Sequence, residues 1–240
     1  MNWIEPDWPV DASVHAATTL TTGGVSQPPF TSLNSALHVG DNQTQVLKNR
    51  QIIKNMLQLP AEPCWLQQVH GNKIVCADNH HAVPVADGSF SEQPGVVCVV
   101  QTADCLPVLM ASADGQKIAA IHAGWRGLLA GILNKACDIM TDKHCAVWLG
   151  PAIGPECFEV GGDVQQAFVQ KSVEFSPAFK QKSESKWLAD IYQLARISLA
   201  QSDVENIYGG QFCTVTDASR FYSYRRDGQT GRMATLIWRD

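Results

Sequence analysis

Apolar and polar residues recur along the chain at two spacings, which predict strands and helices. Alternating apolar residues, or short runs rich in β-branched residues, predict strands. Apolar residues three and four positions apart predict helices. The segments expected as strands are 14–19, 65–69, 73–77, 95–101, 117–122, 146–149, 212–216 and 233–238. The segments expected as helices are 42–59, 126–140, 163–170 and 187–200.

Residues typical of helix ends and turns mark the boundaries of these elements. Asp41 precedes the first expected helix and is a suitable N-cap, and Pro60 ends that helix. Pro107 follows the run 95–101 and has no N–H to give to a sheet. The chain is therefore expected to bend or bulge between 103 and 107.

Strands and helices interleave irregularly, which favours an α/β or α+β fold of mixed sheets flanked by helices. The chain has 240 residues, of which 45% are hydrophobic, enough to bury a large core. It shows no internal repeat and no linker-like stretch. We therefore expect one domain spanning 1–240, with the polar segment 171–186 as a loop or insertion.

The charge balance argues against two classes of partner. Net charge is −5, from 18 basic and 23 acidic residues, whereas binding to a phosphate backbone needs clustered Lys and Arg. The longest apolar run, 95–110, is interrupted by polar residues and is too short to cross a bilayer. No basic start followed by an apolar stretch resembles a secretory signal. We expect a cytoplasmic protein that binds neither nucleic acid nor membranes.

Eight cysteines are present, and no two form a C-x-x-C pair. Without a secretory signal, free thiols are favoured over disulfides. Most of them are expected to be small buried apolar residues. Cys105 is the exception, because of its surroundings in the sequence.

Three short segments each place one metal-ligating residue beside a strand end or a turn. These residues are His70, Cys105 and His122, each close to a Gly or Pro that fixes an irregular backbone. Imidazole nitrogen and thiolate are preferred ligands of zinc and also suit copper. Three protein ligands leave a fourth position open, as in catalytic zinc sites, where the metal activates water or polarises an oxygen.

Spacing alone does not select this interpretation. The three residues are 35 and 17 positions apart, and no single motif joins them. A lone His near a strand end is more often a hydrogen-bonded core residue, and a lone Cys more often only packs.

Taken together, the motifs resemble those of the laccase-domain family, also called the YfiH-like family, over nearly the full chain. The matching segments are Gly23-Gly24-Val25-Ser26, Ser32-Leu33-Asn34, His38-Val39-Gly40-Asp41, Asn49-Arg50, Gln68-Val69-His70-Gly71, Thr102-Ala103-Asp104-Cys105-Leu106-Pro107, His122-Ala123-Gly124-Trp125-Arg126-Gly127, Leu149-Gly150-Pro151-Ala152-Ile153-Gly154, Phe221-Tyr222-Ser223-Tyr224-Arg225-Arg226-Asp227 and Thr230-Gly231-Arg232-Met233-Ala234.

The resemblance implies a YfiH-like layered fold and a metal held by His70, Cys105 and His122, with zinc as the expected ion and copper as the alternative. Members of this family have been described as polyphenol oxidases and as purine nucleoside phosphorylases with adenosine deaminase activity. The implied substrates are therefore purine nucleosides and phosphate. One departure is Thr21, where the family usually has an Arg. If that Arg contacts an anionic part of the substrate, its loss weakens binding here.

Further residues are candidates for substrate binding or proton transfer. Bidentate hydrogen bonding suits Arg to phosphate, and ligand-binding groups often lie on loops. Asp104 is a candidate proton carrier in catalysis together with Cys105 and His122. Gln68 precedes His70 by two residues and would share its face of a strand. The candidates for substrate binding are Asn34, His38, Gln68, Arg50, Arg126, Arg225 and Arg226.

Three other functions use the same residues differently or not at all. A thiol hydrolase acting on cell-wall peptide precursors would use Cys105 as nucleophile and His122 as base, oriented by Asp104 or Asn34. A phenol oxidase with one copper is a second alternative, but the seven His include no H-x-H pair, which argues against an oxygen-reducing copper cluster. A binding protein is the third and leaves the three ligands unused. We expect a monomer, because no exposed helical seam is visible.

Overall fold

The computed structural model describes residues 3–79 and 82–240. The strands are β1 (Trp3–Ile4), β2 (Val14–Thr19), β3 (Ile74–Cys76), β4 (Gly88–Ser91), β5 (Cys98–Thr102), β6 (Leu106–Ala111), β7 (Ile118–Ala123), β8 (Ala146–Leu149), β9 (Glu159–Gly161), β10 (Phe179–Gln181), β11 (Lys186–Ala189), β12 (Ile207–Gly209) and β13 (Met233–Arg239). The α-helices are α1 (Gln43–Met56), α2 (Trp125–Leu129), α3 (Ile132–Met140), α4 (Gly162–Lys171), α5 (Ile191–Ala200) and α6 (Tyr224–Asp227).

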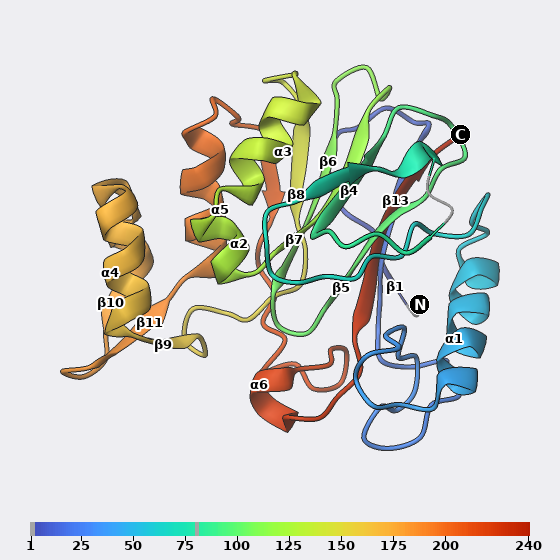
Figure 1. Ribbon diagram of the computed structural model, residues 1–240, viewed down its shortest axis with the longest axis horizontal. Coiled ribbons are helices and arrows are strands. Elements are labelled where there is room, and N and C mark those ends of the chain that lie inside the picture. The colour runs from blue at the N-terminus through green and yellow to red at the C-terminus, as the bar shows by residue number, and fades with distance from the viewer. Residues whose placement is uncertain (1–2, 80–81) are drawn as a thin grey trace.

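These strands form three sheets. One has four strands in the order β1-β2-β13-β5, and the largest has six in the order β12-β8-β6-β7-β4-β3. A small sheet, β10-β11-β9, projects at one end beside α4 (Figure 1). Pairing is antiparallel except between β3 and β4 and between β12 and β8. The predicted fold of mixed sheets flanked by helices is confirmed.

The two larger sheets pack against each other, and helices cover their outer faces (Figure 1). Side chains alternate across each strand, so Leu109 faces the other large sheet while Val108 faces the layer with α3 and α5. In the four-stranded sheet Val99 packs in the cluster beneath α1, and Val100 packs between the sheets. Burial on both faces explains the continuous apolar run predicted here as a strand.

Several predicted elements are confirmed with small shifts in their ends. The strands expected at 14–19 and 146–149 match β2 and β8, and that expected at 117–122 is β7. The expected bend after the run 95–101 occurs at 103–105, where the chain leaves one sheet at β5 and enters the other at β6. No helix in the described part of the chain combines the length and the apolar character that a bilayer crossing requires.

Two predicted helices are wrong in part. The segment 126–140 is two helices, because Gly131 adopts φ +80° between α2 and α3. The segment 187–200 begins as strand β11, and only α5 is helical. The Asp190 carboxylate caps α5 by accepting the amides of Tyr192 and Gln193, a turn signal hidden within an otherwise apolar pattern.

Two predicted strands are also wrong. Segment 65–69 makes only an isolated bridge between Gln67 and Val85 and is otherwise irregular. Segment 212–216 contains a turn closed by a hydrogen bond from the Asp217 amide to the Cys213 carbonyl. In both places apolar side chains pack into the core, although the backbone does not join a sheet. The spacing of apolar residues cannot distinguish such a segment from a strand.

The cap of α1 differs from the prediction by one residue. Asn42 accepts the amide of Gln45, whereas Asp41 accepts hydrogen bonds from Ser26 and Asn34. The helix ends at Met56, short of the expected end at 59. The polar segment 171–186 is partly ordered, as a 3₁₀ helix at Val173–Ala178 followed by β10.

Candidate active site

The register of two neighbouring strands, β6 and β7, places two of the candidate ligands side by side. In the six-stranded sheet, Leu106 of β6 pairs with Ala123 of β7, so Cys105, just before β6, lies beside the end of β7. His122 is in β7 and is buried. An antiparallel pair thus joins residues 17 positions apart that the sequence pattern could not connect.

His70 is brought to the same place by a loop that wraps around a buried carboxylate. Asp87, directly before β4, accepts hydrogen bonds from the amides of Val69, His70 and Gly71 at 3.3, 2.8 and 2.7 Å. His70 adopts φ +58°, a left-handed conformation unusual for a residue with a side chain. The three amide contacts hold this strained turn and fix the position of the His70 ring.

Asp87 also contacts the second imidazole. Its carboxylate lies 2.8 Å from Nδ1 of His122, and its carbonyl accepts the His122 amide at 2.7 Å. An ionised carboxylate only accepts, so Nδ1 carries the hydrogen and Nε2 is free to face Cys105 or a metal. A single fully buried Asp therefore positions both histidines.

The resulting cluster consists of His70, Cys105 and His122, with one ligand atom of each lying within 4.8 Å of the others. The two imidazole rings meet edge to face, with centroids 4.8 Å apart and planes at 75°. His70 is exposed, Cys105 is partly buried and His122 is buried. The cluster could hold a metal ion through two nitrogens and one sulfur, with one side open to solvent.

Electrostatic interactions within the cluster favour the charged forms of both Cys105 and His122. Burial opposes charge on both groups, but His122 and then His70 lower the pKa of the Cys105 thiol to about 6. Burial likewise opposes protonation of His122, yet the Cys105 thiolate and the Asp87 carboxylate raise the pKa of His122 to about 9. Near neutral pH the metal-free cluster therefore pairs a thiolate with an imidazolium.

The cluster opens into a cavity of about 410 Å³ with a mixed cationic and aromatic lining. Its arginine side chains come from distant segments: Arg126 at the start of α2, Arg225 in α6 and Arg232 before β13. The aromatic side chains are Trp125, Phe158 and Tyr224. Such a lining suits a ligand with a planar ring and an anionic group.

Five of the other predicted site residues line this cavity, namely His38, Gln68, Asp104, Arg126 and Arg225. Gln68 is held by the backbone of Gln101, through bonds of 2.9 and 2.8 Å to its carbonyl and amide. Asp104 accepts the Thr214 hydroxyl at 2.6 Å and the Arg225 amide at 2.7 Å. Both of its carboxylate oxygens therefore hold the cavity wall together.

Three predicted residues, Arg50, Asn34 and Arg226, lie outside the cavity lining. Arg50 donates to the Ser35 carbonyl and stacks on the Trp65 ring, with its guanidinium carbon 3.8 Å from the ring centroid. Asn34 is fully buried, and its side-chain oxygen accepts the Arg232 amide at 3.0 Å. Asn34 therefore touches the cavity only through the backbone of a residue that lines it.

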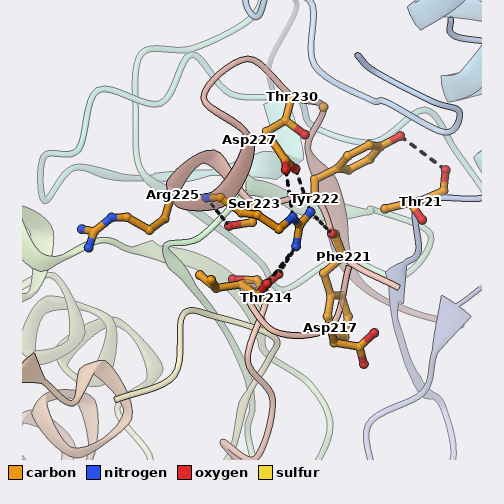
Figure 2. A network of polar contacts seen from close by, with 12 residues as sticks. Thr21, Thr214, Asp217, Phe221, Tyr222, Ser223, Arg225, Asp227 and Thr230 are labelled. Carbon is orange, nitrogen blue, oxygen red and sulfur yellow. Dashed lines mark hydrogen bonds and ion pairs between the residues drawn. The ribbon is translucent and has the colours of Figure 1, made fainter. Parts of the chain in front are cut away.

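Arg225 and Arg226 are neighbours in sequence with opposite surroundings. Arg226 donates to the carbonyls of Thr214 and Phe221 at 2.8 and 3.0 Å and to the Asp227 carboxylate at 2.7 Å. Figure 2 shows the Arg225 side chain extending away from this network. Arg225 lines the cavity and donates to the carbonyls of residues 157 and 159.

Sequence reasoning missed two residues of the site. Asp87 follows Val85 and Ala86 without any periodic or motif signal, and only the fold brings it to the histidines. Arg232 stood within a motif that supported the family resemblance, but it was not selected as a candidate. Its guanidinium donates to the carbonyls of Thr230 and Gly231, and burial lowers its pKa.

Thr21, where the family usually has an Arg, is buried near Tyr222 and does not line the cavity. The Tyr222 hydroxyl donates to its carbonyl at 3.4 Å, and this contact is visible in Figure 2. The Thr21 side-chain hydroxyl donates to the Ser219 carbonyl at 3.5 Å.

Comparison with known proteins identifies the class. A family model described as "Multi-copper polyphenol oxidoreductase laccase" matches residues 15–240, and the chain belongs to this family. The resemblance seen in the sequence motifs is thereby confirmed. A crystal structure of a Neisseria meningitidis protein superposes with a TM-score of 0.97 at 44% identity and covers 100% of both chains.

Relatives carry a more specific name. "Purine nucleoside phosphorylase YfiH" of Escherichia coli is 49% identical over 238 residues, covering 98% of each chain. A purine nucleoside phosphorylase of Pseudomonas aeruginosa is 48% identical over 239 residues, again covering 98% of each. The crystal structure of YlmD from Geobacillus stearothermophilus gives a TM-score of 0.93 at 32% identity, covering 100% of this chain and 96% of that one. The family and these similarities indicate an enzyme.

Proposed function

We propose that this protein is a zinc-dependent purine nucleoside phosphorylase. It would convert adenosine, inosine or methylthioadenosine and phosphate into the free base and ribose 1-phosphate, and would also deaminate adenosine. The observation that carries the proposal is one cavity that contains both a His-Cys-His cluster and three arginines, Arg126, Arg225 and Arg232. The names of the relatives support the same reaction.

The donor set fits zinc. Zinc–nitrogen and zinc–sulfur bonds of about 2.0–2.3 Å put the ligands of a tetrahedral ion roughly 3.3–3.8 Å apart. The ligand atoms here lie within 4.8 Å of one another, so small side-chain movements complete the site. Asp87 holds Nδ1 of His122 and leaves Nε2 as the ligand atom. When bound, zinc would supply Lewis-acid chemistry at its open position.

The cavity side chains would bind and orient the two substrates. Arg225 and Arg232 can hold phosphate by charge-assisted hydrogen bonds, and Trp125, Phe158 and Tyr224 offer flat surfaces to a purine. The carbonyl contacts of the two arginines limit their rotation and keep their remaining donors in fixed directions.

Asp104 contributes mainly by position in this scheme. Because its oxygens already accept Thr214 and the Arg225 amide, it fixes the backbone that presents Arg225. It remains our candidate for carrying a proton, a role that would require one of these hydrogen bonds to open.

The test combines metal analysis with turnover. Protein purified without chelator is assayed for zinc and copper, and for adenosine and inosine turnover with and without phosphate. Phosphorolysis requires phosphate and yields ribose 1-phosphate, whereas deamination yields ammonia without phosphate. We expect Cys105→Ala to lose both metal and turnover, and Cys137→Ala, a matched change at a partly buried cysteine in α3, to retain both. Metal-loaded protein that leaves both nucleosides unchanged under all conditions would refute the purine assignment.

A thiol hydrolase is the second candidate, and one specific arrangement favours it. Cys105, His122 and Asp87 have the relationship of a nucleophile, a base and an orienting carboxylate. Chelation separates the two mechanisms. The proposed metal enzyme loses activity with a chelator and regains it with zinc, whereas a thiol enzyme retains activity with a chelator and is inactivated by alkylation.

The copper chemistry in the family description is a third possibility. Within residues 3–79 and 82–240, one group of three metal-ligating side chains is present, whereas an oxygen-reducing copper cluster needs several histidine groups. Phenol oxidation would therefore arise from a single copper replacing zinc. Phenol-dependent oxygen uptake by copper-loaded protein, compared with zinc-loaded protein, measures it.

A further inference from the structure

Two cysteines outside the metal cluster, Cys157 and Cys213, lie on neighbouring loops beside the cavity wall. Both are partly buried and both are free thiols. The amide of Gly154 donates to the Cys213 sulfur at 3.3 Å. Gly154 also begins a turn that ends at Cys157, closed by a hydrogen bond of 3.0 Å from the Cys157 amide to the Gly154 carbonyl. Such a turn keeps its end Cα atoms within about 7 Å.

The backbone at Gly154 is in direct contact with Cys213. A Cβ atom at position 154 would lie 3.0 Å from both Cβ and Sγ of Cys213, so no side chain separates the turn from that thiol. Burial and the adjacent Cys213 thiol raise the pKa of Cys157. The two cysteines are therefore neighbours across one short turn.

Cys213 has the surroundings of a nucleophile. Burial disfavours its thiolate, but the Thr216 hydroxyl and the amides of Thr216, Gly154 and Val215 outweigh this and lower the pKa of Cys213. Its partner Cys157 remains a protonated thiol. Such asymmetry is typical of a reactive cysteine beside a resolving one.

The reactive sulfur can also be reached. Cys213 lines a second cavity, of about 340 Å³, whose charged lining residues are Arg196 and Asp190. The Arg196 guanidinium donates to the Gly209 carbonyl at 2.9 Å and brings a positive charge to this cavity. A small disulfide can therefore reach Cys213 from this cavity, where its charged groups would meet one side chain of each sign.

We propose that Cys157 and Cys213 are a redox-sensitive dithiol that a low-molecular-weight disulfide oxidises to an intramolecular disulfide. The Cys213 thiolate attacks one sulfur of the small disulfide, forms a mixed disulfide and releases one small thiolate. The Cys157 sulfur then attacks the Cys213 sulfur, loses its proton to solvent and releases the second small thiol. The protein loses two electrons and two protons, and the small disulfide is reduced to two thiols.

The disulfide would join two segments that build the cavity wall. The carbonyl of Cys157 accepts the Arg225 guanidinium at 3.3 Å. Thr214, next to Cys213, donates to Asp104 at 2.6 Å. Oxidation would therefore restrain the two strips of backbone that hold Arg225 in place, whichever reaction the cavity performs.

The experiment uses the full-length protein, reduced and then freed of reductant, at graded ratios of oxidised to reduced glutathione. Remaining thiols are alkylated and the peptides are mapped by mass. We expect a cross-linked peptide pair containing Cys157 and Cys213, lighter by two hydrogen atoms. We also expect slower amide hydrogen exchange at 154–157 in the oxidised protein.

Three variants assign the roles. Cys157→Ser should stop at a mixed disulfide of glutathione with Cys213, and Cys213→Ser should leave Cys157 unmodified. Cys137→Ser, a change at a partly buried cysteine whose pKa burial raises, should form the cross-link normally. The proposal is overturned if wild-type protein forms no such cross-link at any ratio, or if Cys157 is modified equally well without Cys213. The wild-type result decides even if a variant fails to fold.

Discussion

The buried carboxylate of Asp87 lies 2.8 Å from Nδ1 of His122 and at the same time accepts the amide of His70 at 2.8 Å. One residue thus fixes the ring of one candidate ligand and the backbone of another. Carboxylates placed in this way fix the tautomer and the ring orientation of metal-binding histidines.

Asp87→Asn is expected to weaken zinc binding by about 10- to 100-fold, the range typical for loss of an orienting carboxylate. The amide can accept through only one atom, so the turn at His70 loses part of its support. Zinc affinity is measured by competition with a chelating dye. Asp203→Asn, which removes an exposed carboxylate paired with Lys143, should leave the affinity unchanged. Equal affinities for the two variants would contradict the positioning role.

Gly124→Ala is expected to disturb the cluster without unfolding the protein. A Cβ at this position would lie 3.0 Å from the Cys105 sulfur and 3.3 Å from Cδ2 of His70. Overpacking of about 1–3 kcal/mol at the ligands corresponds to roughly a 5- to 150-fold loss of metal affinity. Gly162→Ala is the control, because its Cβ would meet its nearest neighbour at 3.7 Å. Normal zinc affinity in Gly124→Ala would show that the ligands lie further from this glycine than the structure places them.

The lowered pKa of Cys105 predicts an unusual pH dependence in metal-free protein. With a pKa of about 6, the thiolate persists at pH 7 and is lost only as the pH falls through about 6. Alkylation of Cys105 by iodoacetamide should therefore be nearly independent of pH from 7 to 9. An ordinary thiol of pKa about 8.5 would react faster as the pH rises over that range. Peptide mapping follows Cys105 separately from the other cysteines, and a rate that keeps rising to pH 9 would contradict the ion pair.

Substitutions at the two adjacent arginines of α6 should have different effects, on phosphate binding at Arg225 and on the stability of the fold at Arg226. Arg225→Gln should raise the KM for phosphate by about 10- to 100-fold, because a charge-assisted hydrogen bond contributes about 1.5–3 kcal/mol. Arg226→Gln should instead lower the free energy of unfolding by about 1–3 kcal/mol, because the carbonyls of Thr214 and Phe221 lose their partner. Kinetics and denaturant unfolding on both variants test this. The same effect in both would show that their surroundings do not differ in solution.

The spacing of apolar residues predicted many elements, because buried positions in strands and helices are occupied by apolar side chains. Strand β8 was predicted with its observed bounds, since four consecutive buried residues end at a Gly-Pro turn. Other predictions were wrong where a single residue begins or interrupts a helix within a segment whose apolar spacing looks continuous. Asp190 begins a helix inside a segment that looks continuously helical, and Gly131 interrupts another by its positive φ.

The sequence by itself determined the family, the class of fold and the three candidate metal ligands, because their motifs are local and occur in order along the chain. Only the tertiary structure decided which side chains meet. Asp87 reaches His122 through the pairing of β4 with β7 and His70 through the loop that wraps around its carboxylate, and Arg232 rather than Arg226 lines the cavity. The physical reason is that sheet register and loop closure set distances between residues far apart in sequence, whereas periodicity reports only which side of its own element a residue faces.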